Sequence, residues 1–405
     1  MRDLSYLKEK PIAVLGAGAL GKALAADCTL AGNEVRLFDI PPFSETTLSY
    51  VKKTGIEIYG TQLNLYGFRR SGKAELSMVT DQIEKAVKGA GIVIVAVPST
   101  GHESFFKLLI PCLEDGMTVH IIPDNFGSFI FRRMMREMNC NANVLVGGWV
   151  GPPFDARIDF EGNTPLPRVK LDYRALQGKG AALPYRDQED FIESTKFIGA
   201  FESFHSGDGI LPSDTIMDTC LSHMNPLLHT IGMVMGTSVM ENFTPILGKH
   251  LEEFSIYTHA FCPSMAKVQH AFYLEQAAIA KAMGVGISHF VEEEFYSRES
   301  VIGMKYLGKS FRIGYDEINH AAMGTGPQSV NSRYLTEDVP TGCVMFHHLG
   351  RTFGVETPVI DSIITLASAM LKRNFMEEGY TLKTIGIEGF DKEALHRYLK
   401  EGVSA

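Results

Sequence analysis

The sequence has few cysteines, no excess of positive charge and no long apolar run, and each absence excludes a class of protein. Its six cysteines are scattered without a CxxC pair, which in a chain of 405 residues predicts free thiols in a reducing compartment. The net charge of −9 argues against non-specific binding to nucleic acid or to an acidic membrane surface. No run of residues reaches the length of a membrane span, and the first residues lack the pattern of a signal peptide. We therefore expect a cytoplasmic protein.

A metal-binding pattern is also lacking. His347 and His348 are adjacent, but no further ligand follows them at a suitable spacing, and the chain contains no HExxH motif. A solvated or core pair of histidines is the better interpretation, and we expect no metal site.

The chain does have the size and composition of a globular protein with two domains. Its 405 residues exceed one ordinary hydrophobic core, and 45% of them are hydrophobic. We expect a Rossmann-type doubly wound parallel sheet over residues 1–185, since short branched apolar runs alternate there with helical patterns. Residues 186–405 show helical periodicity and predict an α-helical substrate domain.

A glycine motif near the N-terminus predicts dinucleotide binding. Gly16, Gly18 and Gly21 form GxGxxG between an apolar strand and a helical pattern, where they permit a tight turn, close approach of a pyrophosphate and helix packing. Asp39 follows the second strand at the spacing of a carboxylate that binds the adenosine ribose. The alternative is a glycine-rich turn that binds nothing.

Further cofactor contacts are expected after the later strands, because ligands bind outside the carboxyl ends of parallel strands. Pro98 and His102 follow the strand expected over residues 92–97, and Asn125 follows the next one; ordinary loop positions are the alternative for His102 and Asn125. The residues expected to bind the cofactor are Gly16, Gly18, Ala19, Leu20, Gly21, Asp39, Pro98 and His102. Residues 50–78 read as a hairpin insertion, and residues 151–184 as a crossover region with short strands.

Two segments of the helical half carry groups suited to proton transfer and to binding of an acidic substrate. Asn225 is expected to cap a helix that Pro226 opens, which places His229 on its first turns. Histidine titrates near neutral pH and can exchange protons, although a satisfied core histidine is the alternative. Arg333 can grip a carboxylate and Asp338 can orient the histidine, with a surface ion pair as the alternative.

These features resemble the opine dehydrogenase family, the octopine/nopaline dehydrogenase group. The resemblance rests on the glycine motif, on Asn-Pro-x-x-His at 225–229 and on Arg-Tyr-Leu-Thr-Glu-Asp-Val-Pro at 333–340, although Thr230 stands where the family often has proline. It implies NAD(P)H-dependent reductive condensation of a 2-oxo acid, with pyruvate favoured, and the amino group of an amino acid. It also implies a catalytic histidine, which maps onto His229, and an Arg/Asp pair, which maps onto Arg333 and Asp338. We expect Asp338 to act in catalysis with His229, and Arg333 and Asn225 to bind the substrate.

Other functions remain open at this stage. A reductase of a single oxo acid, like ketopantoate reductase, has the same plan, and a nicotinamide-binding sensor without catalysis is a rival from another class. Asp39 favours NAD(H), since its charge repels a 2′-phosphate, whereas Arg69, Arg70 and Lys73 in the insertion would tolerate NADP(H). We expect small-molecule partners only, and a homodimer as the oligomeric state.

Overall fold

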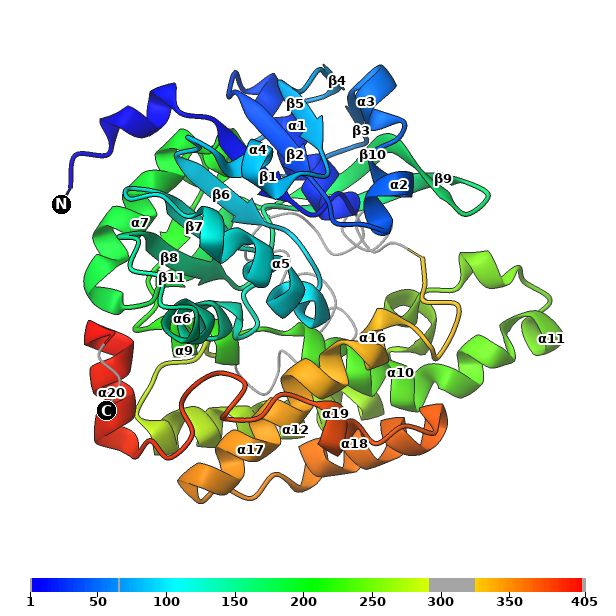
Figure 1. The fold of residues 1–405 in the computed structure, drawn as a ribbon. Helices are drawn as coiled ribbons and strands as arrows, with labels where there is room; N and C mark the ends of the chain where they lie inside the picture. The colour runs from blue at the N-terminus through cyan, green and yellow to red at the C-terminus, as the bar shows by residue number, and fades with distance from the viewer. Residues whose placement is uncertain (1, 65, 291–324, 403–405) are drawn as a thin grey trace. The chain divides into compact units, whose positions relative to one another are not determined.

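The computed structural model describes residues 2–64, 66–290 and 325–402 (Figure 1). The chain divides into two compact units: unit 1 comprises Met1–Thr219 and Glu393–Ala405, and unit 2 comprises Cys220–Lys392. The boundary expected between residues 185 and 186 therefore falls inside unit 1. The reason is that residues 186–219 supply helix α7 and the edge strand β12, which complete the sheet of unit 1.

Unit 1 is built on an eight-stranded sheet in the order β12-β11-β8-β7-β6-β1-β2-β5. The six strands from β8 to β5 are mutually parallel, and β11 runs antiparallel to β8. This order confirms the doubly wound fold, and it brings the carboxyl ends of the parallel strands to one edge. The strands are β1 (Ile12–Leu15), β2 (Val35–Phe38), β5 (Met78–Thr80), β6 (Ile92–Val95), β7 (Thr118–Ile121), β8 (Leu145–Trp149), β11 (Gln177–Ala182) and β12 (Gly209–Leu211).

The central strands are continuous apolar runs, because helices cover both faces of a parallel sheet. Every residue of β1 and β6 is buried. The helices of unit 1 are α1 (Ala19–Leu30), α2 (Phe43–Thr47), α3 (Val51–Thr54), α4 (Ile83–Val87), α5 (His102–Leu109), α6 (Gly127–Glu137), α7 (Gln188–Ser194), α8 (Glu202–His205) and α20 (Lys392–Glu401). Helix α9 (Ile216–Leu221) spans the division between the units.

A second sheet of four strands, in the order β4-β3-β10-β9, packs on helix α1. Its strands are β3 (Ile56–Tyr59), β4 (Gly72–Ala74), β9 (Phe154–Glu161) and β10 (Thr164–Arg174). The expected hairpin is the antiparallel pair β3–β4. Elsewhere in the expected insertion, Leu63 forms only an isolated bridge to Tyr173, and Met78 begins β5 of the main sheet. Strands β9 and β10 are long rather than short, since they pair with each other as well as with the insertion.

A buried ion pair joins this second sheet to α1. The guanidinium of Arg174 donates to both carboxylate oxygens of Asp27 at 2.8 and 2.9 Å, and neither side chain is exposed to solvent. Gln62 accepts two further bonds from Arg174, and Arg70 also donates to Asp27. A buried charge pair of this kind is tolerated because nearly every polar atom has a partner.

The described residues of unit 2 are mainly helical. Their helices are α10 (Asn225–Glu241), α11 (Phe243–Leu247), α12 (Pro263–Met283), α16 (Arg333–Thr336), α17 (Val344–Phe353), α18 (Pro358–Leu371) and α19 (Phe375–Glu378). Helix α12 lies within the range 186–405 for which helical periodicity is predicted, and it ends at Gly284, whose φ of 70° suits glycine. Two π-helical turns, η8 (Ile256–Ala260) and η10 (Val339–Cys343), interrupt the α-helical pattern. Such turns are rare and are often found at functional sites.

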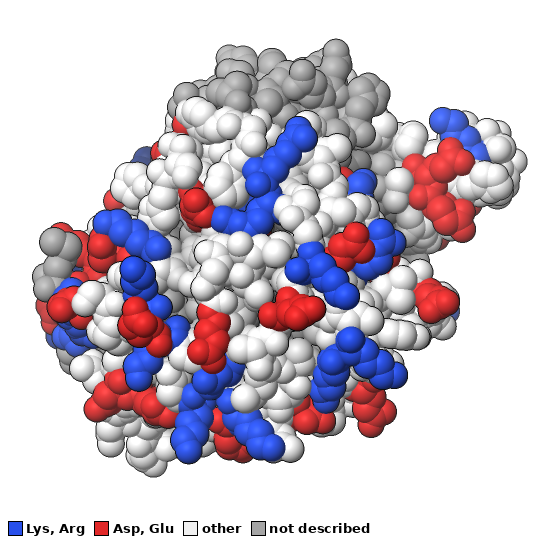
Figure 2. All heavy atoms as spheres, turned by 90° about the horizontal axis from the view of Figure 1, so that it is seen from above, with Lys and Arg blue, Asp and Glu red and all other residues white. Residues whose placement is uncertain are grey.

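The surface carries charges of both signs. On the face seen in Figure 2, acidic and basic side chains are interspersed, and neither sign forms a continuous patch. Within the described residues, no helix is both long enough and apolar enough to cross a membrane.

Candidate active site

The glycine turn between β1 and α1 has the geometry that a bound dinucleotide requires. Gly16 has a φ of 97°, and a Cβ on Gly21 would lie 1.8 Å from the carbonyl oxygen of Gly16, so both positions need glycine for the fold. A Cβ on Gly18 would meet no atom within 4 Å, which leaves open space above the first turn of α1. The free N–H groups of that turn can therefore receive a phosphate.

Asp39 and Lys22 both bond to the backbone of Ala17 in this turn. Asp39, at the end of β2, is buried and accepts hydrogen bonds from the backbone N–H of Ala17, the hydroxyl of Thr47 and the backbone N–H of Ile40. Burial raises the pKa of Asp39, and these bonds oppose the rise. Three of the about four acceptor positions of the carboxylate are used, so one remains for a ribose hydroxyl.

Lys22 has no exposed surface and donates to the carbonyl oxygen of Ala17 at 2.7 Å. Burial lowers the pKa of this lysine to about 8, and the nearby carboxylate of Asp39 opposes that shift. Sequence reasoning missed Lys22, because a lysine inside an apolar helix looks like a solvent-facing residue. Its bond fixes the peptide that precedes Gly18.

The basic residues of the insertion are not equally available to a 2′-phosphate. Arg70 is bonded to Asp27, Glu202 and the carbonyl oxygen of Gly199, all within unit 1. The expectation that Arg70 tolerates NADP(H) is therefore not supported, because its guanidinium is used to hold the second sheet on α1.

The loops after β6 and β7 place the remaining residues expected to bind the cofactor. Pro98 is exposed, and Asn125 donates from its amide to the hydroxyl of Ser99 at 2.9 Å. His102 begins α5 but is fully buried, stacks on Phe106 and has no hydrogen-bond partner at either ring nitrogen. Burial lowers the pKa of His102 to about 3, so the ring is neutral at physiological pH. In this structure the side chain packs in the core of unit 1.

In unit 2, a histidine and a carboxylate far apart in sequence form a buried pair. His229 lies on the second turn of α10, and its Nδ1 is 2.7 Å from Oδ2 of Asp338, which directly precedes η10. Since a carboxylate only accepts, Nδ1 carries the hydrogen. Burial raises the pKa of Asp338 to about 7, with His223 and Arg333 opposing the rise. The pair is thus suited to hold or release a proton near neutral pH.

Asn225 does not cap helix α10 as expected. The N-cap residue is Met224, whose backbone is in the right-handed helical region. No side chain forms a capping hydrogen bond to the first turn. Asn225 is instead the first residue of the helix, half-buried and one turn before His229. Residues four apart share a helix face, so Asn225 stays close to the histidine.

Two tyrosines that sequence reasoning missed complete the surroundings of His229. The hydroxyl of Tyr257, in η8, lies 2.8 Å from Nε2 of His229 and 3.3 Å from the hydroxyl of Tyr334. The ring of Tyr334 stacks on the imidazole with centroids 3.6 Å apart and an angle of 4°. Tyr334 follows Arg333 within the recognised motif, whereas nothing in the sequence singled out Tyr257.

Arg333 is the accessible cation of this site. Its side chain is 60% exposed, and its Nε lies 3.1 Å from Glu337, one helical turn away. His223 is buried nearby, and burial lowers its pKa to about 4 while Asp338 pulls in the opposite direction. An exposed guanidinium whose charge acts on the buried carboxyl of Asp338 is suited to an anionic substrate.

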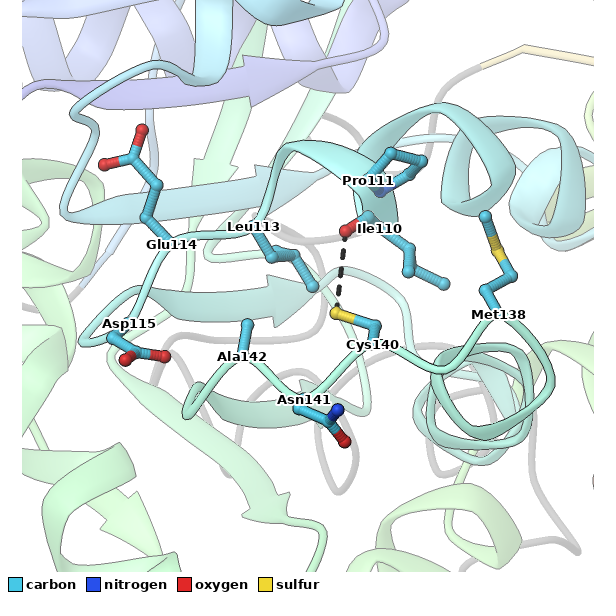
Figure 3. Close-up of a pocket in the computed structure, with 9 residues that line it drawn as sticks. All are labelled: Ile110, Pro111, Leu113, Glu114, Asp115, Met138, Cys140, Asn141 and Ala142. Carbon is cyan, nitrogen blue, oxygen red and sulfur yellow. Dashed lines mark hydrogen bonds between the residues drawn. The ribbon is translucent and has the colours of Figure 1, made fainter.

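A separate cavity lies at the other edge of the sheet of unit 1. About 650 Å³ in volume, it is lined by residues that precede β7 and β8, including Ile110, Glu114 and Cys140 (Figure 3). It therefore lies opposite the carboxyl ends that carry the glycine turn, and none of the expected site residues lines it. Within the described parts of the chain, no group of three or more histidine, cysteine or carboxylate side chains could hold a metal ion.

Two family models match the chain, one in each half. Residues 11–123 match the N-terminal domain of NAD-dependent glycerol-3-phosphate dehydrogenase. Residues 212–371 match the alpha-helical domain of NAD/NADP octopine/nopaline dehydrogenase.

Characterised relatives match over nearly the full length. An opine dehydrogenase of Arthrobacter sp. (strain 1C) is 28% identical over 393 residues, which cover 95% of this chain and 97% of the relative. An octopine dehydrogenase of Pecten maximus is 22% identical over 362 residues, 86% of each chain. Among solved structures, octopine dehydrogenase with NADH and L-arginine has a TM-score of 0.69 at 16% identity, covering 98% of this chain and 99% of that one.

The fold and the site define a nicotinamide-dependent dehydrogenase with a Rossmann-type unit and a helical unit. A ketopantoate reductase structure shares this fold with a TM-score of 0.53 at 14% identity. The more specific matches favour the other group: the helical half matches the octopine/nopaline dehydrogenase model, and the relatives that match over most of the chain are opine and octopine dehydrogenases.

Proposed function

We propose that the enzyme catalyses the NAD(P)H-dependent reductive condensation of a 2-oxo acid, pyruvate in the first instance, with the amino group of an amino acid. The reaction passes through an imine and is reversible. The observation that carries this proposal is the buried pair of His229 and Asp338 in the helical unit of an opine dehydrogenase.

The glycine turn of unit 1 is suited to hold the cofactor. The backbone at Gly18, Ala19 and Leu20 would receive the pyrophosphate, and Asp39 would accept a hydrogen bond from the adenosine ribose. Once bound, the cofactor supplies the hydride. The buried charge of Asp39 disfavours a 2′-phosphate, so NAD(H) is the expected cofactor.

His229 and Asp338 would handle the protons of the reaction. Condensation requires a proton on the oxygen that leaves as water, and the His229–Asp338 pair is suited to supply it. Asp338 fixes the tautomer of the ring and stabilises its charged form. Arg333 would bind a substrate carboxylate with two parallel N–H bonds, and Asn225 would add an amide contact beside His229.

The first test is a substrate screen with a variant of the proposed acid. Oxidation of NADH, followed at fixed pyruvate against each amino acid in turn, should require both substrates. His229→Ala should lower kcat by at least about 100-fold and leave the Kd for NADH nearly unchanged, because the ring handles protons and the cofactor site lies in the other unit.

The same screen separates the rival functions. Turnover with an oxo acid alone would favour a reductase of the ketopantoate-reductase kind, and NADH binding without turnover for any pair would favour a sensor. Repeating the screen with NADPH tests the cofactor preference. Full activity of His229→Ala would remove the histidine from the mechanism.

A cytoplasmic location and a homodimer are parts of the same proposal. All six cysteines are free thiols, as expected in a reducing compartment. Fractionation of cells and sedimentation analysis of the purified enzyme test the two statements.

A further inference from the structure

Both ring nitrogens of His229 are already bonded inside unit 2. Nδ1 donates to Asp338 at 2.7 Å, and Nε2 lies 2.8 Å from the hydroxyl of Tyr257. In a neutral imidazole that donates from Nδ1, Nε2 accepts a hydrogen bond, so the hydroxyl of Tyr257 is the donor. The hydroxyl of Tyr334, at 3.3 Å, can then donate to Tyr257.

The imidazole is also sterically covered. Its side chain is only 11% exposed, and the ring of Tyr334 lies flat against one face at 3.6 Å. Tyr257 and Tyr334 are themselves only half-buried. Of the hydrogen-bonded pair, Tyr257 is therefore the more exposed residue and His229 the buried one.

The backbone of α10 brings Tyr257 to this distance. Gly232 and Gly236 lie on α10 one and two turns after His229, facing η8. A Cβ on Gly232 would come within 2.7 Å of the ring of Phe261, and one on Gly236 within 2.6 Å of the Cβ of Ala260. These two glycines allow the π-helical turn to pack directly on the helix, so the Tyr257 contact follows from the fold of unit 2.

We propose that Tyr257 is a catalytic residue, the terminal proton donor and acceptor of a relay formed by Asp338, His229 and Tyr257. Tyr334 is a positioning residue that holds the relay through its stacked ring and its hydroxyl. This inference rests on the proposed function, since it assigns the atom that delivers the proton in that reaction.

The proton balance of the relay is simple. In the condensation direction, Oη of Tyr257 gives its proton to the hydroxyl oxygen of the carbinolamine, and the C–O bond breaks to release water. The nitrogen lone pair forms the C=N bond, which leaves an iminium ion. Oη takes a proton from Nε2 of the His229 imidazolium, which becomes neutral and keeps its Nδ1 hydrogen bond to Asp338. Solvent then restores the proton, and no electrons pass through the relay.

The alternative is that Tyr257 only covers Nε2 and leaves when substrate binds. The two roles predict opposite effects of Tyr257→Phe, which removes the hydroxyl and keeps the ring. The relay predicts a loss of about 100-fold or more in kcat with little change in the KM values or in the Kd for NADH. A covering role predicts unchanged or increased kcat, and that result would overturn the proposal.

Two further variants separate positioning from folding. Tyr334→Phe keeps the stacked ring and should lower kcat less than Tyr257→Phe, with a changed pH profile. Tyr398→Phe is the matched control, because it removes a buried tyrosine hydroxyl bonded to Arg136 in unit 1 and should leave kcat unchanged. Circular dichroism and thermal unfolding of each variant report whether the fold is kept.

A measurement without turnover distinguishes failure of the relay from failure of the proposed function. With ¹⁵N-labelled histidine, NMR reports the hydrogen bond at Nε2 of His229, and Tyr257→Phe should abolish its signature. If the wild-type enzyme turns over and Tyr257→Phe is equally active, the relay is wrong and the function stands. If the Nε2 hydrogen bond is observed but no substrate pair is turned over, the proposed reductive condensation is wrong. The relay then has no reaction to serve, and its catalytic role is excluded as well.

Discussion

At the scale of single residues, the burial of Asp338 sets how the site responds to pH. Burial raises the pKa of this carboxyl to about 7, and the charges of His223 and Arg333 oppose the rise. The pair must hold a proton for condensation and must be free of it for the reverse oxidation. The rate of condensation should therefore fall as the pH rises through the neutral range, and the rate of oxidation should rise.

Asp338→Asn tests this assignment, because the amide keeps the shape of the carboxyl and cannot ionise. The imidazolium loses its charged partner and is less stable, so the inflection of the condensation profile moves to lower pH. We expect kcat to fall by about 100-fold. Profiles of kcat in both directions check the shift, and an inflection unchanged from the wild type would show that Asp338 does not set it.

Arg333 governs affinity for the anionic substrate in our proposal. Arg333→Met keeps much of the side-chain length and removes the charge, so the KM of one carboxylate substrate should rise about 10- to 100-fold, the value of a charged hydrogen-bonded contact. The KM of Arg333→Lys should lie between those of the wild type and Arg333→Met, because lysine keeps the charge and loses the paired N–H bonds. Equal KM values in all three proteins would exclude the contact.

The sequence predicts the ingredients of this site better than its full geometry. His229 and Asp338 are 109 positions apart, and their motifs suggested a pair that the structure brings to 2.7 Å. Tyr257 could not be predicted in this way. Its place depends on a π-helical turn and on the close packing that Gly232 permits, and neither feature gives a periodic pattern in the sequence.

At the scale of elements, the turn between β1 and α1 offers a matched pair of variants. Gly18→Ala places a methyl group where the structure has open space, so the protein should fold normally while the methyl group obstructs the phosphates. The Kd for NADH should rise about 10- to 100-fold, as expected for the loss of one strong polar contact. Calorimetric titration measures it, and an unchanged Kd would place the cofactor elsewhere.

Gly21→Ala is the contrasting variant of the same helix. Its Cβ would lie 1.8 Å from the carbonyl oxygen of Gly16, so α1 must shift and the free energy of unfolding should fall by about 1–3 kcal/mol. Chemical denaturation of the protein without cofactor measures this loss. Comparison of the two variants separates ligand approach from helix packing.

Element prediction from the sequence was most accurate for long periodic or fully apolar segments. Helix α12 and strand β6 lie where expected, because one periodicity or one apolar run defines each of them. Strands β9 and β10 were underestimated in length. Strand β10 pairs with β3, which lies about a hundred residues earlier in the chain, and a pairing this distant leaves no local signal in the sequence.

At the scale of the whole molecule, the last helix belongs to the first unit. Leu395, Tyr398 and Leu399 of α20 are buried, and the hydroxyl of Tyr398 accepts a hydrogen bond from Arg136 of α6. Leu399→Ala should lower the free energy of unfolding of unit 1 by about 2–5 kcal/mol, the usual cost of emptying a core position. Thermal unfolding with and without NADH checks this, since the ligand reports on unit 1; an unchanged transition would mean that α20 is dispensable.

The buried pair of Arg174 and Asp27 also limits how this fold can be recombined. The two residues lie 147 positions apart, one in the second sheet and one in the helix that follows the glycine turn. Exchange of the second sheet for one without the arginine would strand a carboxylate in the core, at a cost of about 3–5 kcal/mol. Helix α1 and the second sheet must therefore be exchanged together. A stable chimera must carry both Arg174 and Asp27, or neither of them.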